Sequence, residues 1–236
     1  MPAESTGAKR LRDLTSDFQD GVGQGLRSER ERHGLSLREL ARRLEISPSA
    51  LSQIETGRSR PSVGTLYAIV SELEMSLDEL FGAQRTVAAA RGSDALARSE
   101  DAGAPVVQPH DTRKRIELES GVRWERLTPT AEPDADFLYV VYEVGGASSR
   151  EGTHMRHMGR EYGLVLSGRL RVTIGFDDEH ELGPGDSIAF ESSRPHRLEN
   201  AGSEPVEAIW FVVGRSQGDA RKVALDAARE PASGPV

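Results

Sequence analysis

Two kinds of hydrophobic pattern follow one another along the chain. Between Val22 and Phe81, apolar residues recur at helical spacing in short runs that Gly, Ser or Pro interrupts, which predicts a bundle of five short helices. From Pro105 onward, short runs rich in Val, Ile and aromatic residues, such as FLYVVYEV and VEAIWFVV, are separated by Gly, Pro, Asp and Asn. Strands so closely spaced, without helices between them, predict an antiparallel β-barrel or jelly roll. The pattern therefore indicates an α + β protein of two domains.

Composition sets the boundaries of these domains. Residues 83–104 consist mostly of Ala, Arg, Gly and Ser, so they cannot bury much of a core and are predicted to form a linker. The helical domain is predicted to cover residues 20–82, and the β domain residues 105–215. Residues 1–19 and 216–236 are expected to be flexible tails.

Two of the predicted helices have well-defined starts. Ser36 and Glu39 form a capping box before an apolar stripe with helical spacing. Ser47 is a favourable cap, and Pro48 occupies the favoured first position of the next helix. The exposed face of that next helix, residues 47–55, carries small polar side chains, which reach base edges without steric obstruction.

Two short helices joined by a tight turn, the second polar and flanked by arginines, form the arrangement that enters the DNA major groove. The stretch LSLRELARRLEISPSALSQIETGRSRPSVGTL resembles the lambda-repressor/Cro-like helix-turn-helix family, also called XRE-like. The resemblance implies double-stranded DNA as a partner and residues 47–55 as the recognition helix. The implied contacts to base edges or phosphates are Ser47, Ser49, Ser52 and Gln53, and the implied phosphate contacts are Arg38, Arg42, Arg58 and Arg60.

Charge is consistent with a local DNA-binding face on an acidic protein. The formal net charge of −8 argues against a protein that coats nucleic acid indiscriminately. Between Gly23 and Ser62, however, eight arginines outnumber five glutamates. One position departs from the family, which often has a glycine in the turn, because this chain has Glu45 there. The alternative is a helical bundle used only for protein contacts, with its arginines on a solvated face.

The predicted β domain carries two histidine-containing motifs. The stretch HMRHMGREYGLVLSG contains His157, Glu161 and Gly168, and the stretch GPGDSIAFESSRPHRLEN contains Gly185, His196 and Asn200. Their spacing resembles that of the cupin family, whose two motifs supply ligands to one metal inside a small β-barrel. The resemblance implies a metal site of His157, Glu161 and His196. Imidazole and carboxylate groups of this kind hold divalent Fe, Zn, Mn or Ni.

The first cupin motif is incomplete in this chain. Met155 occupies the position of its first histidine, and His154 lies one residue too early, which on a strand directs a side chain to the opposite face. The residues are compatible with a three-ligand metal site, with a metal-free pocket that hydrogen-bonds a small organic ligand, or with a pocket filled by its own side chains. The expected pocket lining is Tyr139, Tyr142, Arg194 and Trp210.

The remaining composition narrows the chemistry and the compartment. The chain has no cysteine, so it has no disulfide, thiolate ligand or thiol nucleophile, and metal binding falls to His, Asp and Glu. No segment has the apolar run of a signal peptide or a membrane span. A cytoplasmic protein without a membrane partner is therefore expected.

The two resemblances together imply a sequence-specific transcriptional regulator, not an enzyme, whose cupin domain senses a small molecule or a metal and modulates operator binding. Because one helix-turn-helix domain binds half a site, a homodimer on a pseudo-palindromic operator is expected. The alternative is a cupin-type mononuclear non-haem metalloenzyme, epoxidase-like or oxygenase-like, that carries a helix-turn-helix domain. In that case His157, Glu161 and His196 would be catalytic ligands.

Overall fold

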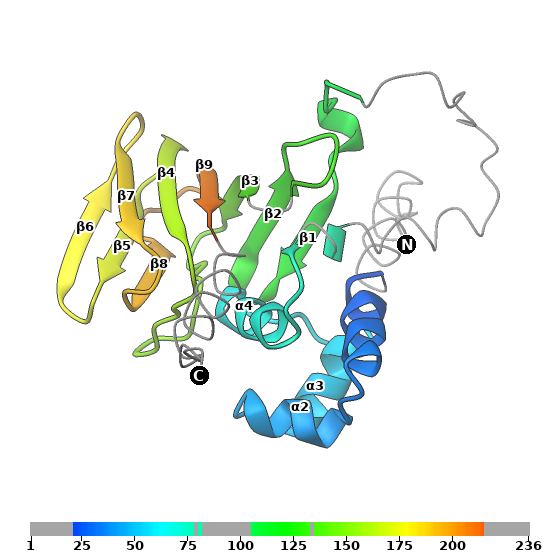
Figure 1. The fold of residues 1–236 in the computed structure, drawn as a ribbon. Helices are drawn as coiled ribbons and strands as arrows, with labels where there is room; N and C mark the ends of the chain where they lie inside the picture. The colour runs from blue at the N-terminus through cyan, green and yellow to red at the C-terminus, as the bar shows by residue number, and fades with distance from the viewer. Residues whose placement is uncertain (1–20, 78–79, 82–104, 133–134, 215–236) are drawn as a thin grey trace, which may run out of the picture.

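The structure is a computed structural model that describes residues 21–77, 80–81, 105–132 and 135–214. Figure 1 shows a group of helices beside a domain of β-sheets, as the hydrophobic pattern predicts. The predicted linker and the two predicted tails lie outside the described residues.

The helical domain has four helices among its described residues, where the sequence predicts five. They are residues 21–32, α2 (Leu37–Arg43), α3 (Pro48–Glu55) and α4 (Val63–Glu72). The expected fifth helix falls on residues 77–81, of which only the first and the last two are described, with helical backbone. Within the described part of the chain, no helix is long and apolar enough to cross a membrane.

Capping side chains define the starts of these helices, as the sequence predicts. The Ser36 hydroxyl accepts a hydrogen bond from the Glu39 amide, and the Ser47 hydroxyl accepts one from the Ala50 amide, both at 3.1 Å. Ser62 caps α4 in the same way. Each hydroxyl replaces a hydrogen-bond partner that the first turn of a helix lacks.

The turn between α2 and α3 depends on a left-handed residue. Glu45 has a φ of 55°, and the next amide, that of Ile46, donates to the Ala41 carbonyl at 3.0 Å. The departure from glycine at this position therefore leaves the turn intact. A side chain in this conformation costs about 1 kcal/mol, which glycine avoids.

A buried ion pair holds α3 against residues 21–32. The Arg30 guanidinium donates to both carboxylate oxygens of Glu55, at 2.6 and 2.9 Å, and also to the Leu35 carbonyl at 2.8 Å. Gly23 allows the close approach of these helices, because a Cβ atom there would lie 2.6 Å from the Ile54 carbonyl oxygen. Arg30 and Glu55 are thus internal.

The β domain is built of two antiparallel sheets. The larger has the strand order β1-β2-β3-β9-β4-β7, and the smaller has the order β6-β5-β8. The strands are β1 (Arg115–Leu118), β2 (Val122–Arg126), β3 (Ala135–Tyr142), β4 (Arg160–Ser167), β5 (Leu170–Ile174), β6 (Asp178–Leu182), β7 (Ser187–Glu191), β8 (His196–Asn200) and β9 (Val206–Val213). The antiparallel β domain is confirmed, and closure of the two sheets into a barrel stays a prediction.

Helix α4 joins the two domains. Its Gly64 amide donates to the Ser148 carbonyl at 3.2 Å, and just before it the Pro61 carbonyl accepts from the Glu119 amide at 2.8 Å. A single cluster of buried apolar residues runs through both domains. Figure 1 shows α4 next to the sheets, with α2 and α3 farther away. The helix therefore fixes the placement of the helix-turn-helix relative to the β domain.

Replacement of Glu45 tests the strain in the turn. Glu45→Gly is expected to raise the free energy of unfolding by up to about 1 kcal/mol, because glycine adopts a positive φ freely. Glu45→Val is expected to lower it by roughly 1–2 kcal/mol, because a β-branched residue fits this conformation poorly. Glu45→Ala is the control for loss of the carboxylate alone. Urea unfolding measures the free energy of unfolding of each variant. A Glu45→Val protein as stable as Glu45→Gly contradicts the expected strain at this position.

Candidate metal centre and DNA-binding face

Three buried side chains from the two predicted motifs converge. Glu161 comes from β4, His196 begins β8, and His157 lies just before β4. The Nε2 atoms of His157 and His196 lie 3.0 and 3.1 Å from the same Glu161 oxygen, Oε1. One ligand atom from each residue fits within 4.8 Å of the others. The structure thus brings together the three residues that the sequence assigns to a metal site.

Backbone carbonyls orient both imidazoles. Nδ1 of His157 lies 3.0 Å from the Met158 carbonyl oxygen, and Nδ1 of His196 lies 2.8 Å from that of Arg194. A carbonyl only accepts, so each Nδ1 carries the proton and donates it. In the neutral ring, Nε2 then presents a lone pair to the centre of the cluster. This is the arrangement by which an outer hydrogen bond prepares a histidine for metal binding.

The glutamate of the cluster is held from its other side. The Trp210 indole donates to Oε2 of Glu161 at 2.7 Å, which leaves Oε1 for the two imidazoles. Burial by itself raises the pKa of Glu161, but the imidazoles of His157 and His196 beside Oε1 outweigh it and hold that pKa below its usual range. Glu161 is therefore a carboxylate.

The cluster has more hydrogen-bond acceptors than donors, so a positive charge at its centre would stabilise it. The two Nε2 atoms and Oε1 are close enough for ion pairing, yet none of the three makes a well-directed hydrogen bond. Buried lone pairs and a carboxylate oxygen directed at one point repel one another unless a cation or protons lie between them. Two imidazoles and one carboxylate fit a divalent ion such as iron or zinc. The chemistry of the donors therefore fits a metal.

The substituted first position of the motif has a different role. Met155 is buried and pairs with His196 through backbone hydrogen bonds of 2.9 and 2.8 Å. A Cβ atom on Gly64 would lie 3.3 Å from the Met155 Cβ, so this residue packs against α4. His154 makes an edge contact with Phe176 at 5.4 Å and lies outside the cluster. The expectation that His154 points away from the cluster is confirmed.

Two other motif residues are structural. Gly168 has a φ of 78°, and a Cβ atom there would lie 2.6 Å from the Pro205 carbonyl oxygen. The Asn200 amide donates to the Tyr142 carbonyl at 3.0 Å and to the Glu204 carbonyl at 2.8 Å. These residues hold loops together and are not part of the three-residue cluster.

A small cavity of about 10 Å³ lies next to the cluster. Tyr142 and Trp210, two of the residues expected to line a ligand pocket, border this cavity. Burial, and then the nearby Glu161 carboxylate, raise the pKa of Tyr142, so its hydroxyl stays neutral. Tyr67 of α4 also lines the cavity, and its ring stacks on that of His157 with centroids 4.0 Å apart and planes at 14°. The cavity holds at most about one water molecule.

The other two residues expected to line a ligand pocket, Tyr139 and Arg194, do not border this cavity. Tyr139 alternates with the inward residues of β3 and lies on the opposite face, beneath the Arg113 guanidinium at 5.8 Å. Burial, and then a hydrogen bond with Glu207, raise the pKa of Tyr139 to about 12. The Arg194 side chain is exposed, 3.6 Å from Asp178, and only its carbonyl serves the site. The inward parity of β3 was open in the sequence because both faces of this strand carry apolar residues.

Sequence reasoning missed the helical contribution to the site. Tyr67 and Val63 line the cavity together with Trp124, whose ring lies 5.4 Å from that of Tyr67. The sequence of α4 did contain a sign of this contact. Val63 and Tyr67 are apolar or aromatic residues that lie outside the stripe of Leu66, Ile69 and Val70, and all five are buried. A helix with such a wide apolar surface is covered on more than one side.

The predicted DNA-contacting residues of α3 are distributed over its surface. Ser49 and Gln53 are exposed, and Ser52 is half-buried. Ser47 caps the helix, so its hydroxyl is already used by an amide. Ser49 and Gln53 are therefore the most exposed of the predicted contacts that have no capping role.

The four predicted phosphate contacts are all exposed but differ in their partners. Arg42 pairs with Glu39 at 2.8 Å, and Arg60 lies 3.9 Å from Glu117 of β1. In the described part of the chain, Arg38 and Arg58 have no ion pair. An arginine without a carboxylate partner can contact a DNA phosphate without first breaking an ion pair.

Fold and site together define a two-domain protein with a helix-turn-helix bundle and a β domain that contains a buried cluster of two histidines and a glutamate. Residues 26–80 match the family model described as helix-turn-helix, and residues 138–212 match that described as cupin domain. The helical domain therefore matches the helix-turn-helix family model, and the β domain matches the cupin family model.

Similarity to individual proteins extends over both domains. The chain is 28% identical over 185 residues to the HTH-type transcriptional regulator PuuR of Escherichia coli, which covers 78% of this chain and 90% of that protein. It is 35% identical over 81 residues to an uncharacterized HTH-type transcriptional regulator of Mycobacterium tuberculosis, covering 34% of this chain and 58% of that protein. A solved HTH_3 family transcriptional regulator from Vibrio cholerae has a TM-score of 0.58 at 23% identity, covers 85% of this chain and 98% of its own, and supports the fold.

The metal content of the purified, tag-free protein tests the candidate metal centre. We expect near-stoichiometric iron, zinc, manganese or nickel by inductively coupled plasma mass spectrometry, and its loss in His157→Ala, because two ligands hold a divalent ion much less tightly than three. His154→Ala is the matched control, since that ring contacts Phe176 and not the cluster. Metal that survives in His157→Ala but disappears in His154→Ala contradicts the assignment.

Proposed function

We propose that this protein is a sequence-specific DNA-binding transcriptional regulator whose cupin domain senses a metal or small molecule through the cluster of His157, Glu161 and His196. The observation that carries the proposal is the direct contact of the two domains at this cluster, where a helix-turn-helix residue, Tyr67, stacks on His157. A ligand that moves His157 would therefore act directly on Tyr67 of the helical domain, with no intervening residues.

A metal ion is the occupant that suits the cluster as it is built. The residues supply two imidazole nitrogens and one carboxylate oxygen, all buried, and the adjacent cavity of about 10 Å³ is too small for an organic molecule. The bound ion would supply the positive charge that these acceptors lack. Trp210 and the two backbone carbonyls keep the ligand atoms in place when the ion is absent.

The geometry favours a regulator over an oxygenase-like enzyme. A mononuclear non-haem metalloenzyme needs open space beside its metal for an organic substrate. Here Tyr67, Trp124 and Met155 fill the space around the cluster. The cluster is thus closed by the protein's own side chains as long as α4 stays in place.

The protein is proposed to act as a dimer, because one helix-turn-helix reads half of a pseudo-palindromic operator. The outer face of the larger sheet carries an aromatic row in register, Phe137 of β3 beside Phe211 of β9 beside Tyr162 of β4. These side chains are 38%, 36% and 43% exposed, and Leu164 and Leu166 extend the row along β4. Contiguous exposed apolar residues on one sheet face are typical of a subunit interface. A second copy with the same face would cover it under two-fold symmetry.

DNA selected from a random library by the full-length protein tests the recognition face. Gln53→Ala is expected to weaken binding roughly 10-fold to 100-fold and to relax sequence preference, because a base-edge contact is lost. Arg38→Ala is expected to weaken binding to all sequences and to lower the slope of log affinity against log salt by about 1. Arg169→Ala, in the β domain, is the control. Selected sequences bound equally by wild type and Gln53→Ala would exclude α3 as the recognition helix.

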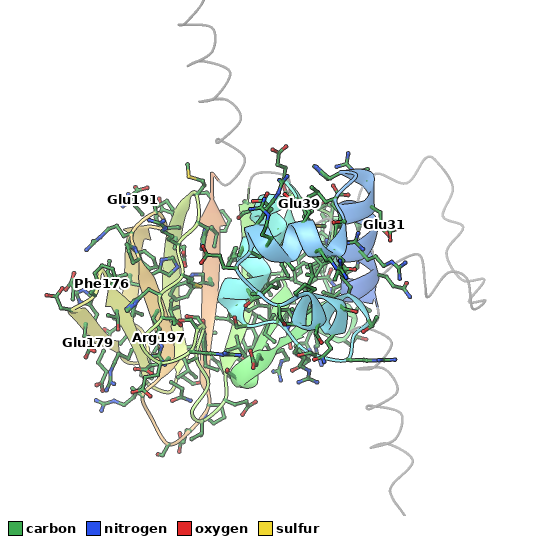
Figure 2. The ribbon with its side chains drawn as sticks, turned by 90° about the horizontal axis from the view of Figure 1, so that it is seen from below. Glu31, Glu39, Phe176, Glu179, Glu191 and Arg197 are labelled. Atoms are coloured by element: carbon green, nitrogen blue, oxygen red, sulfur yellow. The ribbon has the colours of Figure 1, made fainter. Side chains whose placement is uncertain are left out.

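Light scattering with size-exclusion chromatography tests the proposed dimer surface. Phe211→Lys is expected to yield a monomer, because it places a charge in the centre of the aromatic row. Phe176→Lys is the matched control, since that phenylalanine is 77% exposed and lies at the end of the molecule away from the helices (Figure 2). A Phe211→Lys protein that remains dimeric at micromolar concentration places the interface elsewhere.

A further inference from the structure

Tyr67 occupies a position that a ligand of the β domain would be expected to fill. Its ring lies parallel to that of His157, and its edge meets Trp124. It is 4% exposed, although it belongs to a helix of the DNA-binding domain. One face of a cluster residue is therefore covered by the other domain.

The rest of the contact also matches α4 to this place. Gly64 brings the helix backbone so close to the β domain that its amide reaches the Ser148 carbonyl and its α-carbon faces Met155. Met155 stands where the cupin pattern has a histidine, and here it packs against α4. At this position the chain therefore has an apolar contact to the helix-turn-helix domain in place of an imidazole.

A larger cavity lies on the other side of the same contact. Its volume is about 600 Å³, which suits a small organic molecule. It is bounded by the α2–α3 turn at Leu44 to Ile46, by Thr65 of α4 and by the loop that contains Met155. Met155 lines both cavities, so it forms part of the wall between the larger cavity and the interior.

We propose that Tyr67 is a specificity-determining residue of the cupin site, supplied by the DNA-binding domain. Docked on His157, it restricts the interior to a metal ion, and an organic ligand enters only by displacing it. The displacement undocks α4 and releases the helix-turn-helix from its fixed orientation. This inference rests on the proposed function for its consequence in DNA binding, whereas the exclusion of organic ligands depends on geometry alone.

The consequence for DNA recognition follows from the attachment of α4 to the rest of its domain. Arg43 at the end of α2 donates to Glu72 at the end of α4 at 2.8 Å, and the apolar residues of α3 and α4 belong to one buried cluster. Because the Arg43–Glu72 pair ties α2 to α4 and the Ile46 amide ties the start of α3 to α2, α3 is expected to move with α4. A ligand changes DNA affinity only through a difference in its binding to the docked and undocked states, and displacement of Tyr67 supplies that difference.

Cavity filling tests the proposal. Tyr67→Ala removes the phenol ring, and p-cresol, which has the shape of the tyrosine side chain, is the probe. The chain has two tryptophans, both next to the site, so 5-fluorotryptophan gives two ¹⁹F resonances, Trp124 beside Tyr67 and Trp210 on Glu161. Single Trp→Phe variants assign them.

In the wild type we expect Zn²⁺ to shift the Trp210 resonance and millimolar p-cresol to shift neither resonance. In Tyr67→Ala, the Trp124 resonance is expected to move, and p-cresol is expected to bind saturably and move it back. Tyr139→Ala is the matched control, because it removes an equal ring from the outer face of β3. Saturable p-cresol binding of equal strength in wild type and Tyr67→Ala overturns the proposal, as does a folded Tyr67→Ala protein that binds none.

A second variant covers the case in which Tyr67→Ala fails to fold. Gly64→Leu places a side chain against Met155, leaves Tyr67 intact, and is expected to shift the Trp124 resonance and admit p-cresol. A folded Gly64→Leu protein with a wild-type Trp124 resonance also overturns the proposal.

DNA binding separates this proposal from the proposed function. p-Cresol is expected to change the affinity of Tyr67→Ala for its selected DNA at least about 5-fold and to leave the wild type unchanged. If no sequence-specific DNA binding is found, the proposed function as a regulator is contradicted. The ¹⁹F result on the exclusion of p-cresol by Tyr67 would still hold. If DNA binding is specific but p-cresol leaves the affinity of Tyr67→Ala unchanged while bound, the coupling through Tyr67 is overturned alone.

Discussion

The packing of α4 on the β domain is the contact on which the rest of the arrangement depends. It places Tyr67 against His157, brings the Gly64 amide to the Ser148 carbonyl, and merges two apolar cores into one. Because α4 is buried from two sides, its position is determined by both domains at once. Helix α3 consequently has a defined orientation relative to the cluster in the β domain.

The cluster itself is governed by electrostatics. Two carbonyls use the Nδ1 protons of His157 and His196, and Trp210 uses one oxygen of Glu161, so the remaining atoms are all acceptors. Such a group is stable in a buried place only with a positive charge at its centre. The same arrangement that fits a cation is therefore electrostatically unfavourable without one.

The loss of one family ligand and the gain of a domain contact are connected. Met155 contributes no nitrogen to the cluster, but its apolar side chain packs against a glycine of α4. A histidine at this position would place a polar ring against that helix. With Met155 here, three side chains remain as candidate ligands, and the loop beside them packs against the helix-turn-helix domain.

The sequence by itself determined the features that depend on near neighbours. Ser36 and Ser47 cap their helices, and the three cluster residues have the spacing of their motifs, because caps and motifs act within a few residues along the chain. Only the tertiary structure decided that Tyr67 covers His157 and that Tyr139 does not line the pocket. A buried tyrosine on a helix has the same local pattern whichever domain covers it, and the inward face of β3 is set by its pairing with β2 and β9. These choices depend on contacts between residues far apart in the chain, which no local pattern encodes.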